Sequence, residues 1–383
     1  MEKVDSYNSK YPSIEDLRKK AKKKIPKFAF EYLEGGCNED ITLYRNTNNL
    51  RKIELKPTYL VPFSKPSLKT ELFGHNYDAP FGIAPVGLQG LIWPKSPEIL
   101  AKAAFNHNIP FILSTVTTSS IETIAEITEG RAWFQLYHPA KEEVTRDIIR
   151  RIDQVKCPVL VVLSDVPSFG YRPRDIRNGL SMPPKISLKN IFQAIKRPNW
   201  LMETLINGQP NFETLKPYMP RNINLSQLAK FMNDTFEGRL NEEKIKKIRD
   251  LWKGKLVIKG VESIKDIETS IRLGLDGVII SNHGGRQIDV GQATIESLKK
   301  IFPLYNNKIK IMMDSGLRGG ADVSRALASG AEFTFMGRSF MYGVSALGKK
   351  GGDHTISILK TQLTQIMEQL SCNSTKDFKK FLI

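Results

Sequence analysis

Residues 256–283 read LVIKGVESIKDIETSIRLGLDGVIISNH. Two short apolar runs, 256–258 and 277–280, stand on either side of a stretch, 264–273, that has the pattern of a helix. Gly274 follows this stretch, and a glycine in the left-handed conformation commonly ends a helix. Neither run alternates with polar residues, which is typical of parallel strands covered on both faces. The sequence here therefore predicts a strand, a helix and a second, parallel strand.

The same rhythm runs through most of the chain after residue 80. Eight apolar runs have the length of a strand, and helical stretches lie between most of them. Eight such units in roughly 250 residues is the size of a (β/α)8 barrel, the TIM-barrel fold of the α/β class. A doubly wound sheet is the competing fold. The runs are 81–84, 110–114, 132–136, 158–163, 256–258, 277–280, 309–313 and 332–336.

Two segments fall outside this rhythm. Residues 13–34 are predicted to form a helical N-terminal extension, interrupted at Pro26 and ended by Gly35 and Gly36. A long insertion of about residues 180–240 follows the fourth run and combines prolines, aromatic residues and lysines. Long insertions are usually functional, and this one lies on the active-site face of a barrel, so we expect a lid or a membrane-binding segment. The whole chain, residues 1–383, is expected to form one domain.

The chain is strongly basic, with a formal net charge of +17. Such an excess is typical of proteins that bind nucleic acid, an anionic membrane or an anionic substrate, and a coding bias towards Lys, Asn and Ile would also produce it. Cys37, Cys157 and Cys372 lie far apart and in no CxxC pattern. This spacing argues against a disulfide framework or a metal site and favours a reducing compartment. No apolar signal core opens the chain, and no apolar run is long enough to span a membrane.

The strongest chemical signal is Ser281-Asn-His283-Gly-Gly-Arg286, which follows the apolar run 277–280. It places a histidine and an arginine on a loop at the carboxyl end of a strand, where barrel enzymes hold their catalytic residues. A histidine can accept a proton near neutral pH, and an arginine can hold a carboxylate through two hydrogen bonds. Taken alone, the motif would more often be a glycine-rich turn with a solvated histidine.

Three further strand ends carry charged residues. Lys259 ends the fifth run, and a buried lysine there needs an anion as its partner. Asp314-Ser-Gly-Leu-Arg318 ends the seventh run, and Gly337-Arg338 ends the eighth. Barrels commonly bind phosphate at these last two loops, where glycine amides and arginines suit an anion. Either loop alone could consist of helix-capping glycines and a surface arginine. This interpretation is poor for both loops together.

Together these motifs resemble the FMN-dependent L-2-hydroxy acid oxidase and dehydrogenase family, which includes glycolate oxidase, L-lactate dehydrogenase and (S)-mandelate dehydrogenase. The likeness runs from about residue 25 nearly to the C-terminus. The stretches around Trp93-Pro-Lys95, Gly170-Tyr-Arg172 and Asp314-Ser-Gly316 most resemble the membrane-associated bacterial lactate and mandelate dehydrogenases. Further collinear motifs are Glu31-Tyr32-Leu-Glu-Gly-Gly36, Ala84-Pro-Val-Gly87, Leu113-Ser114-Thr115, Trp133-Phe-Gln135-Leu-Tyr137 and Gly170-Tyr-Arg172-Pro-Arg-Asp175.

The resemblance implies a site that oxidises a small L-2-hydroxy acid to the 2-oxo acid. His283 matches the base that removes a proton from the substrate, and Asp165 matches the carboxylate that orients this base. Arg172 and Arg286 match the pair that grips the substrate carboxylate. The two tyrosines that hydrogen-bond the substrate are matched by Tyr32 and Tyr137, although either one alone would be interpreted as a packing aromatic.

The resemblance also implies FMN as the cofactor, and no metal. No G-x-G-x-x-G fingerprint of a nicotinamide site follows the first strand. Lys259 matches the lysine beside the N1–C2=O edge of the flavin, where its charge stabilises the reduced ring. Leu163 departs from the family, because most members have a Thr there. The positions that match contacts to FMN are Pro85, Val86, Gly87, Ser114, Gln135, Lys259, Ser281, Asp314, Ser315, Gly316, Arg318, Gly337 and Arg338.

Within the family, the sequence favours an L-lactate dehydrogenase. Gly87 stands where oxidases tend to have Ala, which favours electron transfer to quinone or another carrier over oxygen. Phe192, Trp200 and Met202 in the insertion resemble the segment that attaches bacterial dehydrogenases to membranes. We therefore expect peripheral attachment at the cytoplasmic side of the inner membrane. Family members are often tetramers, so a homo-oligomer is also expected.

Several alternatives are left open. The substrate could be a mandelate-like aromatic acid, or the acceptor could be oxygen. An FMN-dependent isomerase would keep the phosphate motifs but would have no need of His283, Arg172 and Arg286. A nucleic-acid-binding barrel would cluster its basic residues with exposed aromatics. The lysines here are spread along the chain apart from a modest cluster at 19–24, so we expect no nucleic-acid partner.

Overall fold

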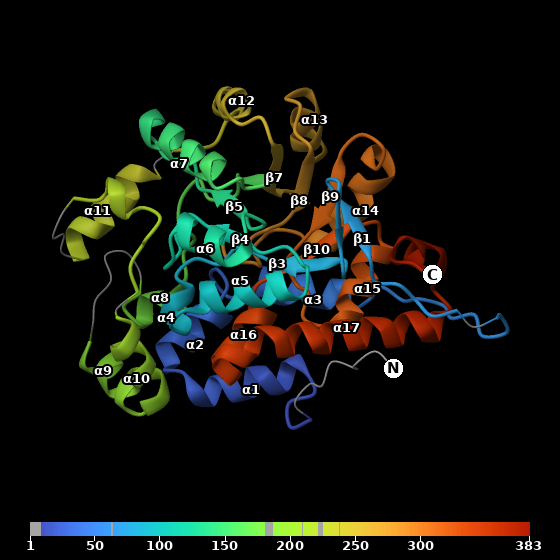
Figure 1. Cartoon of the computed structure of the whole chain (residues 1–383), viewed down its shortest axis with the longest axis horizontal. Helices are drawn as coiled ribbons and strands as arrows, with labels where there is room; N and C mark the ends of the chain where they lie inside the picture. The colour runs from blue at the N-terminus through green and yellow to red at the C-terminus, as the bar shows by residue number, and fades with distance from the viewer. Residues whose placement is uncertain (1–8, 63, 181–186, 209, 221–224, 237) are drawn as a thin grey trace.

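The centre of the structure is an eight-stranded parallel sheet surrounded by helices (Figure 1). This computed structural model describes residues 9–62, 64–180, 187–208, 210–220, 225–236 and 238–383. The strand order is β3-β10-β9-β8-β7-β6-β5-β4, and a parallel bridge between Ile83 and Phe111 joins the two end strands. The sheet therefore closes into a barrel, and the predicted (β/α)8 fold is confirmed.

Each of the eight predicted apolar runs overlaps one barrel strand. The strands are β3 (Phe81–Ile83), β4 (Ile112–Ser114), β5 (Trp133–Leu136), β6 (Val159–Leu163), β7 (Lys255–Val261), β8 (Gly277–Ile280), β9 (Lys310–Met313) and β10 (Phe333–Met336).

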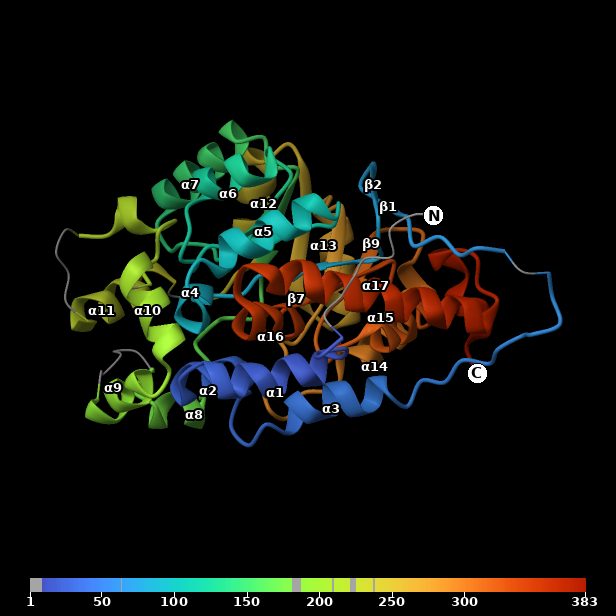
Figure 2. The same cartoon turned by 60° about the horizontal axis from the view of Figure 1, so that its bottom comes forward.

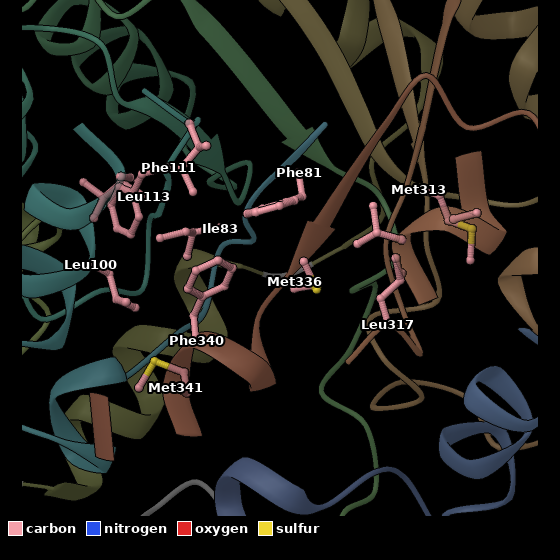
Figure 3. Close-up of a cluster of buried hydrophobic side chains, with 14 of the residues drawn as sticks. Phe81, Ile83, Leu100, Phe111, Leu113, Met313, Leu317, Met336, Phe340 and Met341 are labelled. Atoms are coloured by element: carbon pink, nitrogen blue, oxygen red, sulfur yellow. The ribbon is translucent and has the colours of Figure 1, made fainter. Parts of the chain in front are cut away.

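Two apolar layers hold the barrel together, because successive side chains of a strand point to opposite faces. One layer fills the barrel interior, and its strand residues include Ile112, Trp133, Val159, Val161, Val257, Ile279, Met312, Phe333 and Phe335. The intervening residues, such as Leu160 and Val278, pack outwards against the helices. Figure 3 shows part of this outer layer, where Ile83 of β3 lies near Leu100, Phe111 and Phe340.

A short antiparallel hairpin, β1 (Thr70–Leu72) and β2 (His75–Tyr77), covers the N-terminal end of the barrel. Leu72 and Tyr77 belong to the interior apolar cluster. The hydroxyl of Tyr77 accepts a hydrogen bond from the indole nitrogen of Trp133 at 3.2 Å. With this end plugged, the C-terminal ends of the strands are the open face of the barrel.

Helices form the outer ring and the N-terminal extension. The extension consists of α1 (Ile14–Lys24), α2 (Lys27–Glu34) and α3 (Ile41–Leu50), and Pro26 separates the first two, as predicted. The helices outside the insertion are α4 (Gln89–Ile92), α5 (Ser96–Asn106), α6 (Ile121–Thr128), α7 (Glu142–Gln154), α12 (Glu242–Leu251), α13 (Ile264–Arg272), α14 (Thr294–Tyr305), α15 (Gly320–Ala328), α16 (Arg338–Leu347) and α17 (Gly351–Leu370), with 3₁₀ turns η2 (Gly348–Lys350) and η3 (Thr375–Phe381).

The segment after β6 contains helices that lie to one side of the barrel (Figures 1 and 2). They are α8 (Pro173–Arg177), α9 (Leu188–Ile195), α10 (Pro198–Asn207), η1 (Lys216–Tyr218) and α11 (Leu225–Thr235).

Trp200, expected among the membrane-facing residues of the insertion, is only 6 % exposed. Its ring meets that of Phe28 edge to face at 5.6 Å, and its indole nitrogen donates to the carbonyl of Ile92 at 3.1 Å. That assignment was wrong, because Trp200 fixes α10 to the body of the protein. Phe192 and Met202 are exposed, as expected.

Two glycines after helices provide a matched test of the packing. Gly274 and Gly330 both have positive φ, at +70° and +112°. A Cβ at Gly274 would meet nothing within 4 Å, whereas one at Gly330 would collide with the ring of Phe302. Gly274→Ala should therefore cost about 1–2 kcal/mol from backbone strain alone, and Gly330→Ala clearly more. Thermal unfolding at a fixed scan rate measures the difference, and an equal or smaller loss in Gly330→Ala would contradict the packing described here.

Candidate active site

A cavity of about 550 Å³ opens at the C-terminal end of the barrel strands. Most of the residues expected at the site line it: Tyr32, Pro85, Val86, Gly87, Tyr137, Arg172, Lys259, His283, Arg286, Asp314, Ser315, Gly316, Arg318, Gly337 and Arg338. The other four are not part of its lining among the described residues: Ser114, Gln135, Asp165 and Ser281. Asp165 and Ser281 contact lining residues from behind.

The alternation of the strands explains the floor of the cavity. Val257, Ile279 and Met312 point into the barrel, so the residues two positions further along also point inwards, one layer nearer the open end. In this way the alternation places Ser114, Gln135, Leu163, Lys259, Ser281 and Asp314 in one layer. Leu163, where most members of the family have a Thr, thus puts a buried alkyl group among the polar residues of this layer. Ser114 Oγ is buried and has no hydrogen-bond partner in the described structure, which fits a polar ligand above it.

A buried ion pair lies in this layer. Lys259 is 3 % exposed, and its Nζ lies 3.0 Å from Asp314 Oδ2 and 2.8 Å from Ser281 Oγ. Burial opposes the charged form of the lysine, but Asp314 and Asp165 outweigh it and raise the pKa of Lys259. The floor therefore carries a fixed ammonium group that stays charged at neutral pH.

His283 faces the cavity with a carboxylate behind it. Its Nδ1 lies 3.1 Å from Asp165 Oδ1, which leaves the other ring nitrogen for a ligand. Gly260, at φ +95°, makes this approach possible, because a Cβ there would collide with the Asp165 side chain. Burial opposes ionisation of Asp165, but His283 and Lys259 hold its pKa below the usual value. Asp165 is therefore ionised at neutral pH, and the stabilisation it provides is lost only as the pH falls through this lowered pKa.

Two arginines also line the cavity. Arg172 precedes α8 and lies 3.2 Å from Asp175, while Nη2 of Arg286 lies 3.8 Å from the same carboxylate oxygen. Burial raises the pKa of Asp175, and the two guanidinium groups act against this. Sequence reasoning gave Asp175 no role, although its position three residues after Arg172 was the signal that could have found it.

The two tyrosines lie close to these charged groups. The guanidinium of Arg286 is 5.0 Å from the centre of the Tyr32 ring, and the Tyr32 hydroxyl is 3.4 Å from the Gly87 carbonyl. Tyr137 follows β5, and its ring meets Phe236 of the insertion at 5.5 Å. Burial, reinforced by Asp165, raises the pKa of Tyr137 well above its ordinary value. The Tyr137 hydroxyl therefore stays a neutral hydrogen-bonding group beside the cavity, and Tyr32 brings a second hydroxyl to it.

The loops after the seventh and eighth strands have the character of an anion site. Helix α16 begins at Arg338 and points its first backbone N–H groups towards this end of the barrel, and Arg318 lines the cavity nearby. The side chain of Arg338 has a different task, because its three nitrogens donate to the carbonyls of Leu33, Gly35 and Gly284 at 2.9–3.1 Å. Burial and the nearby Arg318 lower the pKa of Arg338 to about 9.

Apolar side chains of the insertion close one side of the cavity. Phe212 and Met232 are buried there, at 4 % and 2 % exposure, and Leu180 lines the same wall. The composition of the insertion predicted a lid or a membrane-binding segment, but it could not show which residues of the insertion reach the cavity. The part of the chain covered by the structure contains no group of three His, Cys, Asp or Glu side chains arranged to hold a metal.

The fold and the site define a barrel enzyme with a buried cation, a histidine–carboxylate pair and an anion site at the open end. The chain belongs to the FMN-dependent dehydrogenase family, whose model matches residues 21–383. Members of this family that act on 2-hydroxy acids use FMN as their cofactor. The residues present fit this cofactor, because the unpartnered Ser114, the charged Lys259 and the helix N-terminus suit its ring and its phosphate.

The relatives have different substrates. (S)-Mandelate dehydrogenase of Pseudomonas putida is 34 % identical over 94 % of this chain and 90 % of its own length. L-lactate dehydrogenase of Vibrio parahaemolyticus is also 34 % identical, over 95 % of this chain and 96 % of its own. A crystal structure of (S)-mandelate dehydrogenase, described as a monotopic membrane protein, has a TM-score of 0.91 and 33 % identity, with 97 % and 98 % of the chains covered.

The buried ion pair can be tested without any cofactor. Lys259→Met leaves the carboxylate of Asp314 buried without its cation, which should cost about 3–5 kcal/mol. Lys259→Met with Asp314→Asn removes both charges and should cost less. Thermal unfolding of the FMN-free proteins measures both losses. Equal losses in the single and double variants would show that the pair is not the stabilising element.

Proposed function

We propose that this protein oxidises a small L-2-hydroxy acid, with L-lactate favoured, to the 2-oxo acid. The observation that carries the proposal is that one cavity brings together His283 with Asp165 and Arg172 with Arg286. A 2-hydroxy acid presents a carboxylate and a hydroxyl on neighbouring carbons, so it needs a cationic anchor and a base a short distance apart. An isomerase would need neither group.

FMN, when bound, supplies the acceptor for the two electrons that leave the substrate. The groups that would hold its ring are Ser114, Gln135, Lys259, Ser281 and the backbone of Pro85, Val86 and Gly87. The groups that would hold its ribityl chain and phosphate are Asp314, Ser315, Gly316, Arg318, Gly337 and the backbone of Arg338.

His283 is proposed as the base. Its free ring nitrogen accepts a proton from the substrate, and Asp165 keeps the ring in the required tautomer and stabilises the cation that forms. Arg172 and Arg286 would bind the substrate carboxylate, with Asp175 holding the two guanidinium groups near one another. Tyr32 and Tyr137 would donate hydrogen bonds to the substrate oxygens.

A second candidate substrate is a larger aromatic 2-hydroxy acid. It is supported by the apolar wall formed by Leu180, Phe212 and Met232, which could accommodate a phenyl group. Relatives named for lactate and for mandelate are equally similar, so their names favour neither substrate.

Anaerobic mixing of the FMN-loaded protein with candidate acids tests the reaction and its substrate together. L-lactate should bleach the flavin absorbance and D-lactate should not, because a carboxylate on the two arginines, a hydroxyl at His283 and the flavin as acceptor would together fix the handedness of the acid. Bleaching by L-mandelate alone would select the aromatic substrate. Failure of L-lactate, L-mandelate and glycolate would overturn the proposed reaction.

His283→Gln provides the matched control for this measurement. It should retain FMN but reduce the flavin about 10²–10⁴-fold more slowly, because it lacks a base. A rate close to that of the wild type would remove His283 from its proposed role.

The acceptor is proposed to be quinone or another carrier. The support is Gly87, which stands where oxidases of the family tend to have Ala. An added Cβ would lie 2.8 Å from Val116 Cγ2, so the packing of Val116 disfavours Ala at this position. In air, the enzyme should reduce a quinone analogue much faster than it releases peroxide. Peroxide formation as fast as quinone reduction would identify it as an oxidase.

We also propose that the protein attaches peripherally to the cytoplasmic side of the inner membrane. None of the helices in the described part of the chain is long and apolar enough to cross a bilayer. The support is a surface that we call the α9–α10 patch, composed of the exposed residues Leu188, Ile191, Phe192, Ile195, Met202, Leu205 and Ile206. The spacing of these residues places them on one face of each helix, and exposed apolar helix faces are typical of interaction surfaces. By family analogy the protein is also proposed to be a homo-oligomer, which a light-scattering mass of one chain would contradict.

Cell fractionation tests the attachment. The full chain should sediment with bacterial membranes at low salt, and Phe192→Ser with Met202→Ser should move it into the soluble fraction. Ile264→Ser with Leu304→Ser, which replaces exposed apolar residues elsewhere, should leave it with the membranes. A wild-type protein found in the soluble fraction at low salt would contradict the proposal.

A further inference from the structure

Helix α1 is divided lengthwise into an apolar face and a basic face. Ile14, Leu17 and Ala21 are buried, and α1 packs along α16. Lys19, Lys22 and Lys23 are exposed, and their i, i+3, i+4 spacing places them together on the opposite side of the helix. We call these three residues the α1 lysine row.

The α1 lysine row differs from the neighbouring arginine of the same helix in its pairing. Among the described residues, its three lysines take part in no ion pair, whereas the neighbouring Arg18 pairs with both Glu15 and Glu34. Lys24 is used internally, because its Nζ lies 4.1 Å from the centre of the Trp93 ring and donates to the carbonyl of Ala346. Three like charges on one helix face repel one another, and an anionic partner would relieve that repulsion.

Helices α9 and α10, which carry the α9–α10 patch, are attached close to the C-terminal end of α1. Arg197, just before α10, donates to the carbonyl of Ile25 at 3.2 Å. The backbone N–H of Phe28 donates to Gln193 of α9 at 3.0 Å, and the ring of Phe28 packs on Trp200. These contacts fasten both helices to the junction between α1 and α2. In Figures 1 and 2, α9 and α10 lie beside this end of the N-terminal helices.

We propose that the α1 lysine row binds the anionic headgroups of a bilayer, while the α9–α10 patch inserts into the apolar region below the headgroups of the same bilayer. This inference rests on the proposed membrane attachment and extends it from the insertion to the N-terminal helix. A bilayer offers both partners, an apolar interior and a layer of negative charge. Nucleic acid offers only the charge and would leave the aliphatic side chains of the patch unmatched.

The number of lysines sets how much the α1 lysine row should add to the affinity for an anionic membrane. Each lysine close to an anionic leaflet strengthens binding about fivefold, so three contribute on the order of 100-fold. Because this attraction acts over a distance of about 8–10 Å at physiological salt, it should weaken as salt is added. The contribution of the patch should persist.

Co-sedimentation of the full-length, FMN-loaded protein with vesicles tests the proposal. One set of vesicles is phosphatidylcholine alone, and the other also contains phosphatidylglycerol. The variant Lys19→Gln, Lys22→Gln, Lys23→Gln should lose on the order of 100-fold in affinity for the anionic vesicles and almost nothing for the neutral ones. The control variant Lys246→Gln, Lys253→Gln, Lys265→Gln removes the same charge near α12 and α13, at the opposite side of the molecule in Figure 1, and should lose little.

Flavin content and thermal unfolding would establish that all the variants are folded. Equal losses in the two variants would reduce the effect to net charge and overturn the role of α1. Wild-type protein that binds both kinds of vesicle equally would overturn headgroup binding but leave the attachment intact. Wild-type protein that binds neither kind, or binds RNA instead, would overturn the attachment as well. Flavin reduction by the substrate reports the proposed reaction independently of all these outcomes.

Discussion

Two half-buried arginine side chains hold the end of α2 over the mouth of the barrel, and the arrangement of the site depends on them. Arg286 donates to the carbonyls of Tyr32 and Gly35, and Arg338 donates to those of Leu33 and Gly35. The last carbonyls of a helix have no partner within the helix and carry its negative dipole end, so cations are well suited to this position. The same contacts place Tyr32 beside the cavity and draw Arg286 away from solvent. The N-terminal extension is therefore part of the candidate site.

The rest of the site follows from the period of two along the strands. Inward positions are apolar in the middle of the barrel and become polar one layer nearer the open end, so the floor is built without any irregular backbone in most strands. The exception is β7, whose pairing with β8 shifts in register between Lys259 and Val261. Gly260 lies within this shift, and its lack of a side chain admits Asp165 behind His283. The glycine and the shift bring a charged floor and a charged pair together at one strand end.

Much of this could be predicted from the sequence. The barrel follows from apolar runs and helix ends, which are local signals, and the loop positions of His283, Arg286 and Asp314 follow from where those runs stop. What could not be predicted depends on contacts between distant segments. The sequence marks Arg338 as an anion-binding residue, but its side chain serves the carbonyls of α2, more than 300 residues earlier. Trp200 lies in a segment with the composition of a membrane-binding surface, yet its own side chain is buried against Phe28 and Ile92. The role of Asp175 was not predictable either, because it arises only where Arg172 and Arg286 from separate loops approach the same carboxylate.

The central claim is that Arg172 and Arg286 hold the carboxylate of a 2-hydroxy acid while His283 faces its oxygen-bearing carbon. A crystal structure of the FMN-loaded protein with the 2-oxo acid product tests it most directly. The account predicts that the product carboxylate accepts hydrogen bonds from both arginines and that its keto oxygen lies within reach of His283. A carboxylate bound away from both arginines, or a keto oxygen turned away from His283, would contradict the account.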